Sequence, residues 1–177
     1  MTYRTTSAVR LVTFTLVPVF ALELIAQRQT HSALLGDVRA TVTQVREASG
    51  EELTRYKLHP RAGYHAVLVF VTFKNVGQYP SCTELHEWLR VKEGYEYPRA
   101  FVWSALRRPN PHNLPATEES SGAFGFEVKD GTRPVVLKLI RNTLGETMCI
   151  EMQHREKAIS GPQTAILSLQ GIPEKSD

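Results

Sequence analysis

The fold is decided by the longest β-favouring run in the chain, His65-Ala-Val-Leu-Val-Phe-Val-Thr-Phe-Lys-Asn-Val-Gly77. The run ends at Asn75 and Gly77 because both residues favour turns over strands. Alternate residues of a strand point to opposite sides, and both sides of this one begin with apolar residues. One face carries Val67, Val69, Val71 and Phe73, and the other carries Ala66, Leu68, Phe70 and Thr72. The pattern predicts a central strand that is covered on both faces for part of its length.

Shorter strand patterns lie on both sides of this central run. They cover residues 37–46, 85–92, 95–97, 100–106, 123–128, 135–140, 147–153 and 164–170. One helical turn is expected over 51–56, and the strands 123–128 and 135–140 are expected to pair with each other across Lys129-Asp-Gly131. Short strands separated by Gly and Pro, without a sustained helical period, indicate an all-β antiparallel sandwich. A small closed barrel is the alternative.

The N-terminus has the pattern of a signal peptide over residues 1–26. Arg4 and Arg10 precede a mostly apolar run that is shorter than the roughly 20 residues of a membrane-spanning helix. Cleavage is expected after Ala21, with Ala26 as the second choice, and it would leave no stable membrane span. The alternative is that this segment forms a buried first strand or helix of a cytosolic protein.

Length and composition bound the remaining organisation. A chain of 177 residues suits one domain, with a flexible lead over 27–36, a sandwich over 37–140 and an extension over 141–177 that adds strands to the same domain. The apolar content of 42% and charged content of 22% are typical of globular proteins. A formal net charge of +3, with Arg107-Arg108 as the only adjacent basic pair, does not indicate a nucleic-acid partner.

Two cysteines, Cys82 and Cys149, are the only ones in the chain. In an oxidising compartment such a pair is expected to form a disulfide. Closing a loop of this length contributes on the order of 4 kcal/mol in the chain-entropy model. The alternative is two unpaired thiols whose Cα atoms lie too far apart to bond.

Three segments together resemble a known family. They are Val69-Phe-Val-Thr-Phe-Lys-Asn-Val-Gly77, the spacing of Leu89, Gly94 and Tyr97, and Gly122-Ala-Phe-Gly-Phe-Glu-Val-Lys-Asp-Gly131 with the strand after it. This combination is similar to the immunoglobulin-like domains of unknown function in bacterial secreted proteins and lipoproteins, relatives of the mycobacterial immunoprotective extracellular protein.

The resemblance covers roughly residues 37–140 and implies an immunoglobulin-like β-sandwich with a secreted or periplasmic location. The chain departs from the family pattern where Pro115 is followed by Ala116 instead of Gly, and it lacks the lipid-attachment cysteine of many relatives. The family has no general catalytic residues, so the resemblance implies no catalytic site and no cofactor.

A metal site is the first alternative function. Cys82, His86, Cys149 and His154 would supply thiolate and imidazole ligands suited to zinc or copper, if the fold brought them together. The other histidines tested as ligands, His59, His65 and His112, form no close His-x-His or His-x-x-x-His pair.

An extracellular hydrolase is the second alternative. Its acids would come from Glu51-Glu52 or Glu118-Glu119, although adjacent carboxylates in polar segments are usually solvated. The sequence contains no Gly-x-Ser-x-Gly, no phosphate-binding glycine loop and no dinucleotide fingerprint.

The leading prediction is a non-catalytic binding or accessory module with a protein or cell-envelope partner. Its contacts are expected from the segment 107–122, a long predicted loop that contains three prolines. The candidate surface residues are Phe70, Trp88, Tyr97, Arg107 and Arg108. The aromatic residues among them have the alternative role of filling the core.

Overall fold

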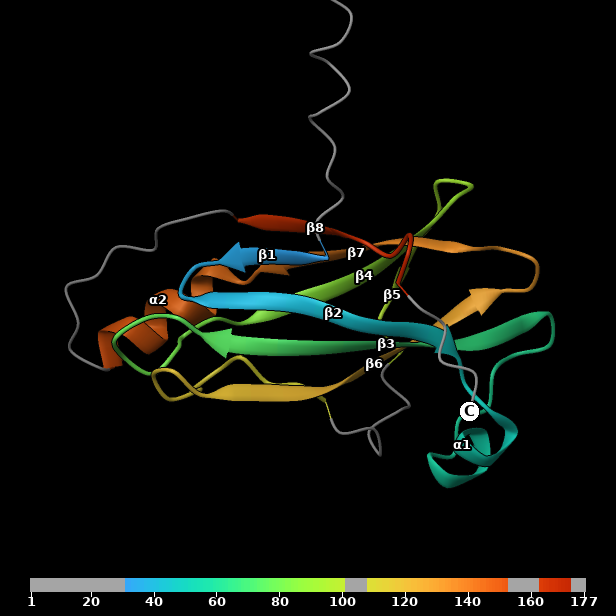
Figure 1. The fold of residues 1–177 in the computed structure, drawn as a ribbon, viewed down its shortest axis with the longest axis horizontal. Helices are drawn as coiled ribbons and strands as arrows, with labels where there is room; N and C mark the ends of the chain where they lie inside the picture. The colour runs from blue at the N-terminus through green and yellow to red at the C-terminus, as the bar shows by residue number, and fades with distance from the viewer. Residues whose placement is uncertain (1–30, 101–107, 153–162, 173–177) are drawn as a thin grey trace, which may run out of the picture.

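A computed structural model describes residues 31–100, 108–152 and 163–172 of the chain. Its elements in chain order are β1 (Ser32–Leu35), β2 (Val38–Glu47), α1 (Gly50–Arg55), β3 (Tyr64–Asn75), β4 (Leu85–Val91), β5 (Glu96–Pro98), β6 (Glu119–Lys129), β7 (Pro134–Arg141), α2 (Thr143–Met152) and β8 (Thr164–Ser168). The strands form two four-stranded sheets in the orders β1-β2-β3-β6 and β5-β4-β7-β8, with every neighbouring pair antiparallel. The predicted all-β, immunoglobulin-like antiparallel sandwich is therefore confirmed in its architecture (Figure 1).

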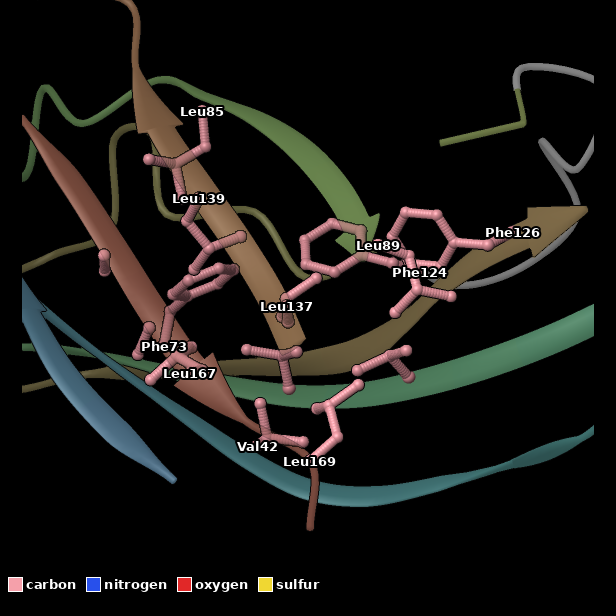
Figure 2. Packing of buried hydrophobic residues seen from close by; sticks show 14 of the residues in the cluster. Val42, Phe73, Leu85, Leu89, Phe124, Phe126, Leu137, Leu139, Leu167 and Leu169 are labelled. Atoms are coloured by element: carbon pink, nitrogen blue, oxygen red, sulfur yellow. The ribbon is translucent and has the colours of Figure 1, made fainter. Parts of the chain in front are cut away.

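The main core lies between the two sheets (Figure 2). One face of β3 faces this core, and Phe73 packs its ring edge-on against Phe124 of β6 with the ring centroids 6.2 Å apart. Leu137 and Leu139 of β7 meet them from the opposite sheet and are fully buried. Burial of this many large side chains between two sheets is the main source of stability of such a sandwich.

The other face of β3 is covered as well. Ala66 and Leu68 form a second apolar cluster with Leu58, which follows α1, and with Ala123 of the neighbouring β6. The central strand is thus covered on both faces for part of its length, as its residue pattern predicts. The helix α1 that accompanies this cluster begins with a capping box, in which Ser49 and Glu52 each bond the other's backbone N–H.

Phe70 lies at the edge of this second cluster. It is partly buried against residues of the α1 segment, and the guanidinium of Arg46 lies 5.1 Å from the centroid of its ring. The C-terminal strand β8 pairs with β7 in the opposite sheet. β8, the described strand of the C-terminal extension, therefore does not cover Phe70, which packs against the cluster on the α1 side instead.

The strands β6 and β7 do not pair with each other, contrary to the sequence prediction. β6 pairs with β3, whereas β7 lies between β4 and β8 in the second sheet. The turn after Lys129 therefore carries the chain from one sheet to the other. In both segments, apolar residues that face the core alternate with other residues. This pattern fits a hairpin and a crossing between sheets equally well, so it could not distinguish these two connections.

The predicted strand 147–153 is also wrong, because its described residues, 147–152, belong to the helix α2. The helix begins after Asn142 and is held by tertiary contacts of Glu146 and Cys149. Among the described residues of the C-terminal extension, β8 forms the expected kind of structure, since the strand prediction 164–170 overlaps it.

The expected lead over 27–36 contains a strand rather than flexible chain alone. β1 pairs with β2, and Leu35 is completely buried in the main core. The expected loop 107–122 is shorter than predicted because β6 begins at Glu119. The signal peptide over 1–26, most of the strand expected at 100–106, Arg107 and His154 lie outside the described residues. In the part of the chain that the structure describes, no helix is long and apolar enough to cross a membrane.

Candidate functional site

The two cysteines are joined in a disulfide, which confirms that prediction. The Cα atoms of Cys82 and Cys149 are 5.6 Å apart, and the two residues are 6% and 3% exposed. The bond connects the segment before β4 to the middle of α2. It therefore attaches the helix to one end of the sandwich, at the left in Figure 1.

A pocket of about 340 Å³ lies beside this attachment. Its polar lining residues are Thr83, Glu84, His86, Arg108, Asn110, His112 and Asn142. We call it the loop pocket, because three of these seven side chains come from the segment before β6 that the sequence marks as the binding loop. The other four come from the end of the segment before β4, from the start of β4 and from the residue between β7 and α2.

Asn75 holds this loop in place, although it is completely buried. Its amide nitrogen donates to the carbonyl oxygens of Tyr79 and Leu114, each at 2.8 Å, and its amide oxygen accepts from Gly77 N–H at 2.8 Å. Its backbone N–H and carbonyl bond the 117–118 turn. All polar atoms of Asn75 are thus satisfied by two loops. Sequence reasoning identified Asn75 and Gly77 only as a strand end, although an Asn two residues before a Gly is a known turn signal.

Glu84 forms the wall of the loop pocket toward α2. Its carboxylate accepts a hydrogen bond of 3.0 Å from the Asn142 side chain, and its backbone carbonyl accepts from Asn142 N–H at 2.9 Å. A side chain at Gly145 would collide with this carboxylate, because a Cβ there would lie 2.7 Å from Glu84 Cδ. The negative charge of Glu84 lies at the first turn of α2, where it interacts favourably with the positive end of the helix dipole. Sequence reasoning missed Glu84 and Asn142, and no local pattern marks them.

His112 faces Glu84 across the loop pocket. The distance from His112 Nδ1 to Glu84 Oε1 is 3.9 Å, which is too long for a hydrogen bond. His112 Nδ1 is buried and has no hydrogen-bond partner among the described residues. A bound group or water between these two atoms would be able to bond both of them. His86 is exposed on the opposite part of the lining.

Arg108 brings a positive charge to the same pocket. Its guanidinium donates to Glu87 at 3.0 Å, while Arg99 Nη1 lies 3.3 Å from the other oxygen of that carboxylate. The Glu87 side chain is 4% exposed, whereas that of Arg108 is 49% exposed. Burial and, more weakly, neighbouring Arg108 lower the pKa of Arg99, although the Glu87 charge opposes them. Glu87 is thus buried beneath two guanidiniums, and the half-exposed Arg108 presents positive charge toward solvent.

The aromatic candidates do not form one surface. Trp88 pairs with Pro98, and its neighbour Leu89 pairs with Tyr97. Because Leu89 is buried in the main core and Tyr97 packs against that core, Tyr97 faces inward while Trp88 faces outward. Phe70 lies on the other sheet beneath the α1 segment. Of the candidate surface residues that the structure describes, only Arg108 lines the loop pocket.

The acid pairs of the hydrolase alternative are held in ion pairs or turns. Glu52 accepts two hydrogen bonds, of 2.5 and 2.7 Å, from Arg46, and these bonds lower the pKa of Glu52 to about 2. Glu51 pairs with Arg55 on the exposed side of α1, and Glu119 pairs with Lys74 at 3.0 Å. Glu118 is exposed in the turn before β6. The four carboxylates lie in two separate places and do not converge on a pocket.

The metal alternative loses its thiolates, because both sulfurs are used in the disulfide. His86 and His112 line the loop pocket, His59 is exposed, and His65 lies elsewhere between Glu47 and Asp130. Among the described residues, no group of three or more His, Cys, Asp or Glu side chains is arranged to hold a metal ion.

Comparison with known proteins gives similarity in fold alone. No protein-family model and no curated protein matches the chain. Among solved structures, a candidate lipoprotein of Bacillus subtilis matches with 14% identity and a TM-score of 0.50 over 82% of this chain, which spans 40% of the length of that protein.

Two other solved structures match less well. An uncharacterized β-sandwich protein of Clostridium difficile matches with 9% identity and a TM-score of 0.44, over 78% of this chain and 89% of its own. The secreted protein MPT63 of Mycobacterium tuberculosis matches with 15% identity and a TM-score of 0.45, over 63% of this chain and 85% of its own.

Proposed function

We propose that this protein is a non-catalytic, extracytoplasmic binding or accessory module of the bacterial immunoglobulin-like type, and that its partner docks over the loop pocket. The observation that carries the proposal is the buried disulfide between Cys82 and Cys149. Disulfides persist in secreted and periplasmic proteins and are rare in the cytosol. The same bond supports a binding role, because it ties the segment that carries Thr83 and Glu84 to the helix that follows Asn142.

The disulfide makes the pocket a rigid surface. Cys82 is followed by Thr83 and Glu84, which line the pocket, and Cys149 holds the helix against which Glu84 packs. Asn75 holds the opposite, loop-derived wall. A preorganised surface loses little conformational entropy when a partner binds, and this is what a binding module requires.

The polar groups of the pocket indicate the chemistry of the partner. Arg108 is half-exposed and retains guanidinium donors, and His86 is exposed beside it. These side chains suit hydrogen-bond acceptors or acidic groups on a protein or another component of the cell envelope. Glu84 limits the match, because its carboxylate repels an acidic group that enters from the α2 side.

The location is tested by the intact mass of the protein exported by its native host, measured before and after thiol alkylation without reductant. The expected result is loss of the first 21 or 26 residues with no alkyl adduct. A full-length mass that carries two alkyl groups would reject the extracytoplasmic assignment.

The binding surface is tested by photo-crosslinking in the native host. A benzophenone amino acid replaces His112 in the loop pocket, and the matched control carries it at exposed Lys129, the last residue of β6. We expect a discrete adduct from position 112 and none from position 129, and Arg108→Ala should weaken that adduct. Equal adducts from both positions, or none from position 112, would refute docking at this pocket.

A further inference from the structure

A second cavity, of about 310 Å³, opens at the end of the sandwich opposite α2. It lies between the end of β2, the starts of β3 and β7, and the segment after β8, on the right in Figure 1. Its apolar lining residues are Val45, Val67, Leu169 and Ile172. All four belong to the main core or pack against it, so the cavity is an opening into that core. We call it the Arg133 pocket.

Two irregularities accompany the opening between the sheets. A register shift between Val42 and Gln44 interrupts the pairing of β2 with β3, and such a bulge bends the strand. After β8, Gly171 takes a φ of +78°, which turns the chain away beyond Leu169. The volume of the cavity lies at the lower end of the range for small-molecule sites.

The mouth of the pocket carries an unused positive charge. Arg133 lines the pocket and is exposed, and its side chain makes no ion pair or hydrogen bond with the described residues. The other guanidinium at the mouth, that of Arg46, is committed to Glu52 through two hydrogen bonds. Arg133 is therefore the group at this site that can receive an anion.

The remaining charged groups at the mouth face one another. The ring of His65 lies between two carboxylates, with Nε2 3.6 Å from Glu47 and Nδ1 3.2 Å from Asp130. Glu47 also lines the pocket and disfavours a ligand with several negative charges. A ligand with one anionic group and an apolar body matches this arrangement best.

We propose that the Arg133 pocket binds a free single-chain carboxylic acid. The alkyl chain lies along Val45, Val67 and Leu169, where it extends the main core, and the carboxylate accepts hydrogen bonds from the Arg133 guanidinium. The site is separate from the loop pocket and does not rest on the function proposed for it.

The proposal is tested by NMR titration of the oxidised protein with butanoate, hexanoate and octanoate below their micelle concentrations. Affinity should rise about fourfold for each added methylene, since each buried methylene contributes about 0.8 kcal/mol. Octanoate should bind at least tenfold more tightly than octylammonium, which has the same chain. The methyl signals of Val67 and Leu169 should shift first.

Two variants separate the guanidinium from the general charge of the protein. Arg133→Gln should weaken octanoate binding about tenfold, because it removes charge-assisted hydrogen bonds. Arg39→Gln, at an exposed position of β2, removes the same charge elsewhere and should leave the affinity unchanged. Both variants should keep the melting temperature, since each replaces an exposed side chain.

Equal binding of octanoate and octylammonium, absence of a chain-length dependence, or equal affinity of Arg133→Gln and the parent protein would each overturn the proposal. Phosphatidylglycerol vesicles provide the other source of an acyl chain beside an anion. Binding to vesicles that depends on Arg133 and is not displaced by octanoate would assign the pocket to membrane lipid instead, and would also overturn it.

Discussion

Removal of the disulfide should destabilise the protein by a predictable amount. The bond joins residues that are 67 positions apart, and a closed loop of this length restricts the unfolded chain by about 4 kcal/mol. We expect the double variant Cys82→Ala/Cys149→Ala to lose this free energy of unfolding, together with about 1 kcal/mol for lost sulfur contacts, since both residues are buried. The total free energy of unfolding of a typical domain is only about 5–15 kcal/mol.

The loss of stability after removal of the disulfide should be uneven along α2. The first turn of the helix keeps a second attachment, because Arg141 Nη2 donates to Glu146 at 2.5 Å and both side chains are almost completely buried. Breaking such a buried pair typically costs about 3–5 kcal/mol. Reduction of the disulfide should therefore speed amide exchange from Cys149 onward in the helix, while the amide of Glu146 stays protected.

The assay is urea unfolding at pH 7 of the oxidised protein, the same protein with reductant, and the double variant. The reduced protein isolates the contribution of the cross-link, because it keeps both sulfurs. Its slope m should also rise, since an unfolded chain without the cross-link is less compact. If the fully reduced protein, verified by mass, loses less than about 1 kcal/mol, the chain-entropy reasoning is refuted.

Three other substitutions test the scaffold of the candidate site and the α1 segment. Asn75→Ala removes three buried side-chain hydrogen bonds and should cost about 3 kcal/mol in urea unfolding. Asn75→Asp, which keeps only the acceptor, should not restore that loss. Gly145→Ala should destabilise the parent protein because it displaces the Glu84 carboxylate. In a Glu84→Ala background it should instead stabilise by up to about 1 kcal/mol, and stabilisation in both backgrounds would contradict the contact. The Arg46 bonds hold the pKa of Glu52 near 2, below its ordinary value of 4.5, so their contribution is complete above pH 4.5 and is lost as the pH falls toward 2. Between pH 4.5 and 2, the free energy of unfolding should therefore fall less steeply with pH for Glu52→Gln than for the parent protein.

The parts of the fold that the sequence predicts well are those whose residue pattern allows one solution. The double-faced run of β3 requires cover on both sides, and Val69 and Leu68 are indeed completely buried on opposite faces. The disulfide followed from the pairing of the only two cysteines with an expected oxidising compartment. In both cases, a strong local signal agrees with the tertiary structure.

The errors fall where tertiary contacts decide between two local structures. In α2, Met148, Cys149 and Ile150 form a short apolar run, which fits a strand as well as a helix. Gly145 lowers the helix propensity of the same segment. The helix is stabilised by the disulfide, which the sequence predicts without indicating a helix, and by the Arg141–Glu146 pair, which no sequence pattern marks. The loop pocket shows the same limit, because Arg108 was a candidate whereas its neighbours Glu84 and Asn142 come from distant segments.

The two ends of β3 explain why this sandwich has pockets of different chemistry. At the C-terminal end of the strand, Asn75 bonds the backbone of two loops, and the nearby pocket is lined mainly by residues with hydrogen-bonding side chains. At the N-terminal end, Val67 is the last apolar residue on the inner face before His65. The sheets separate there before the apolar surface ends, which leaves Val67 and Leu169 beneath an opening whose rim is charged. One strand therefore determines a rigid polar surface at one end of the molecule and an accessible part of the core at the other.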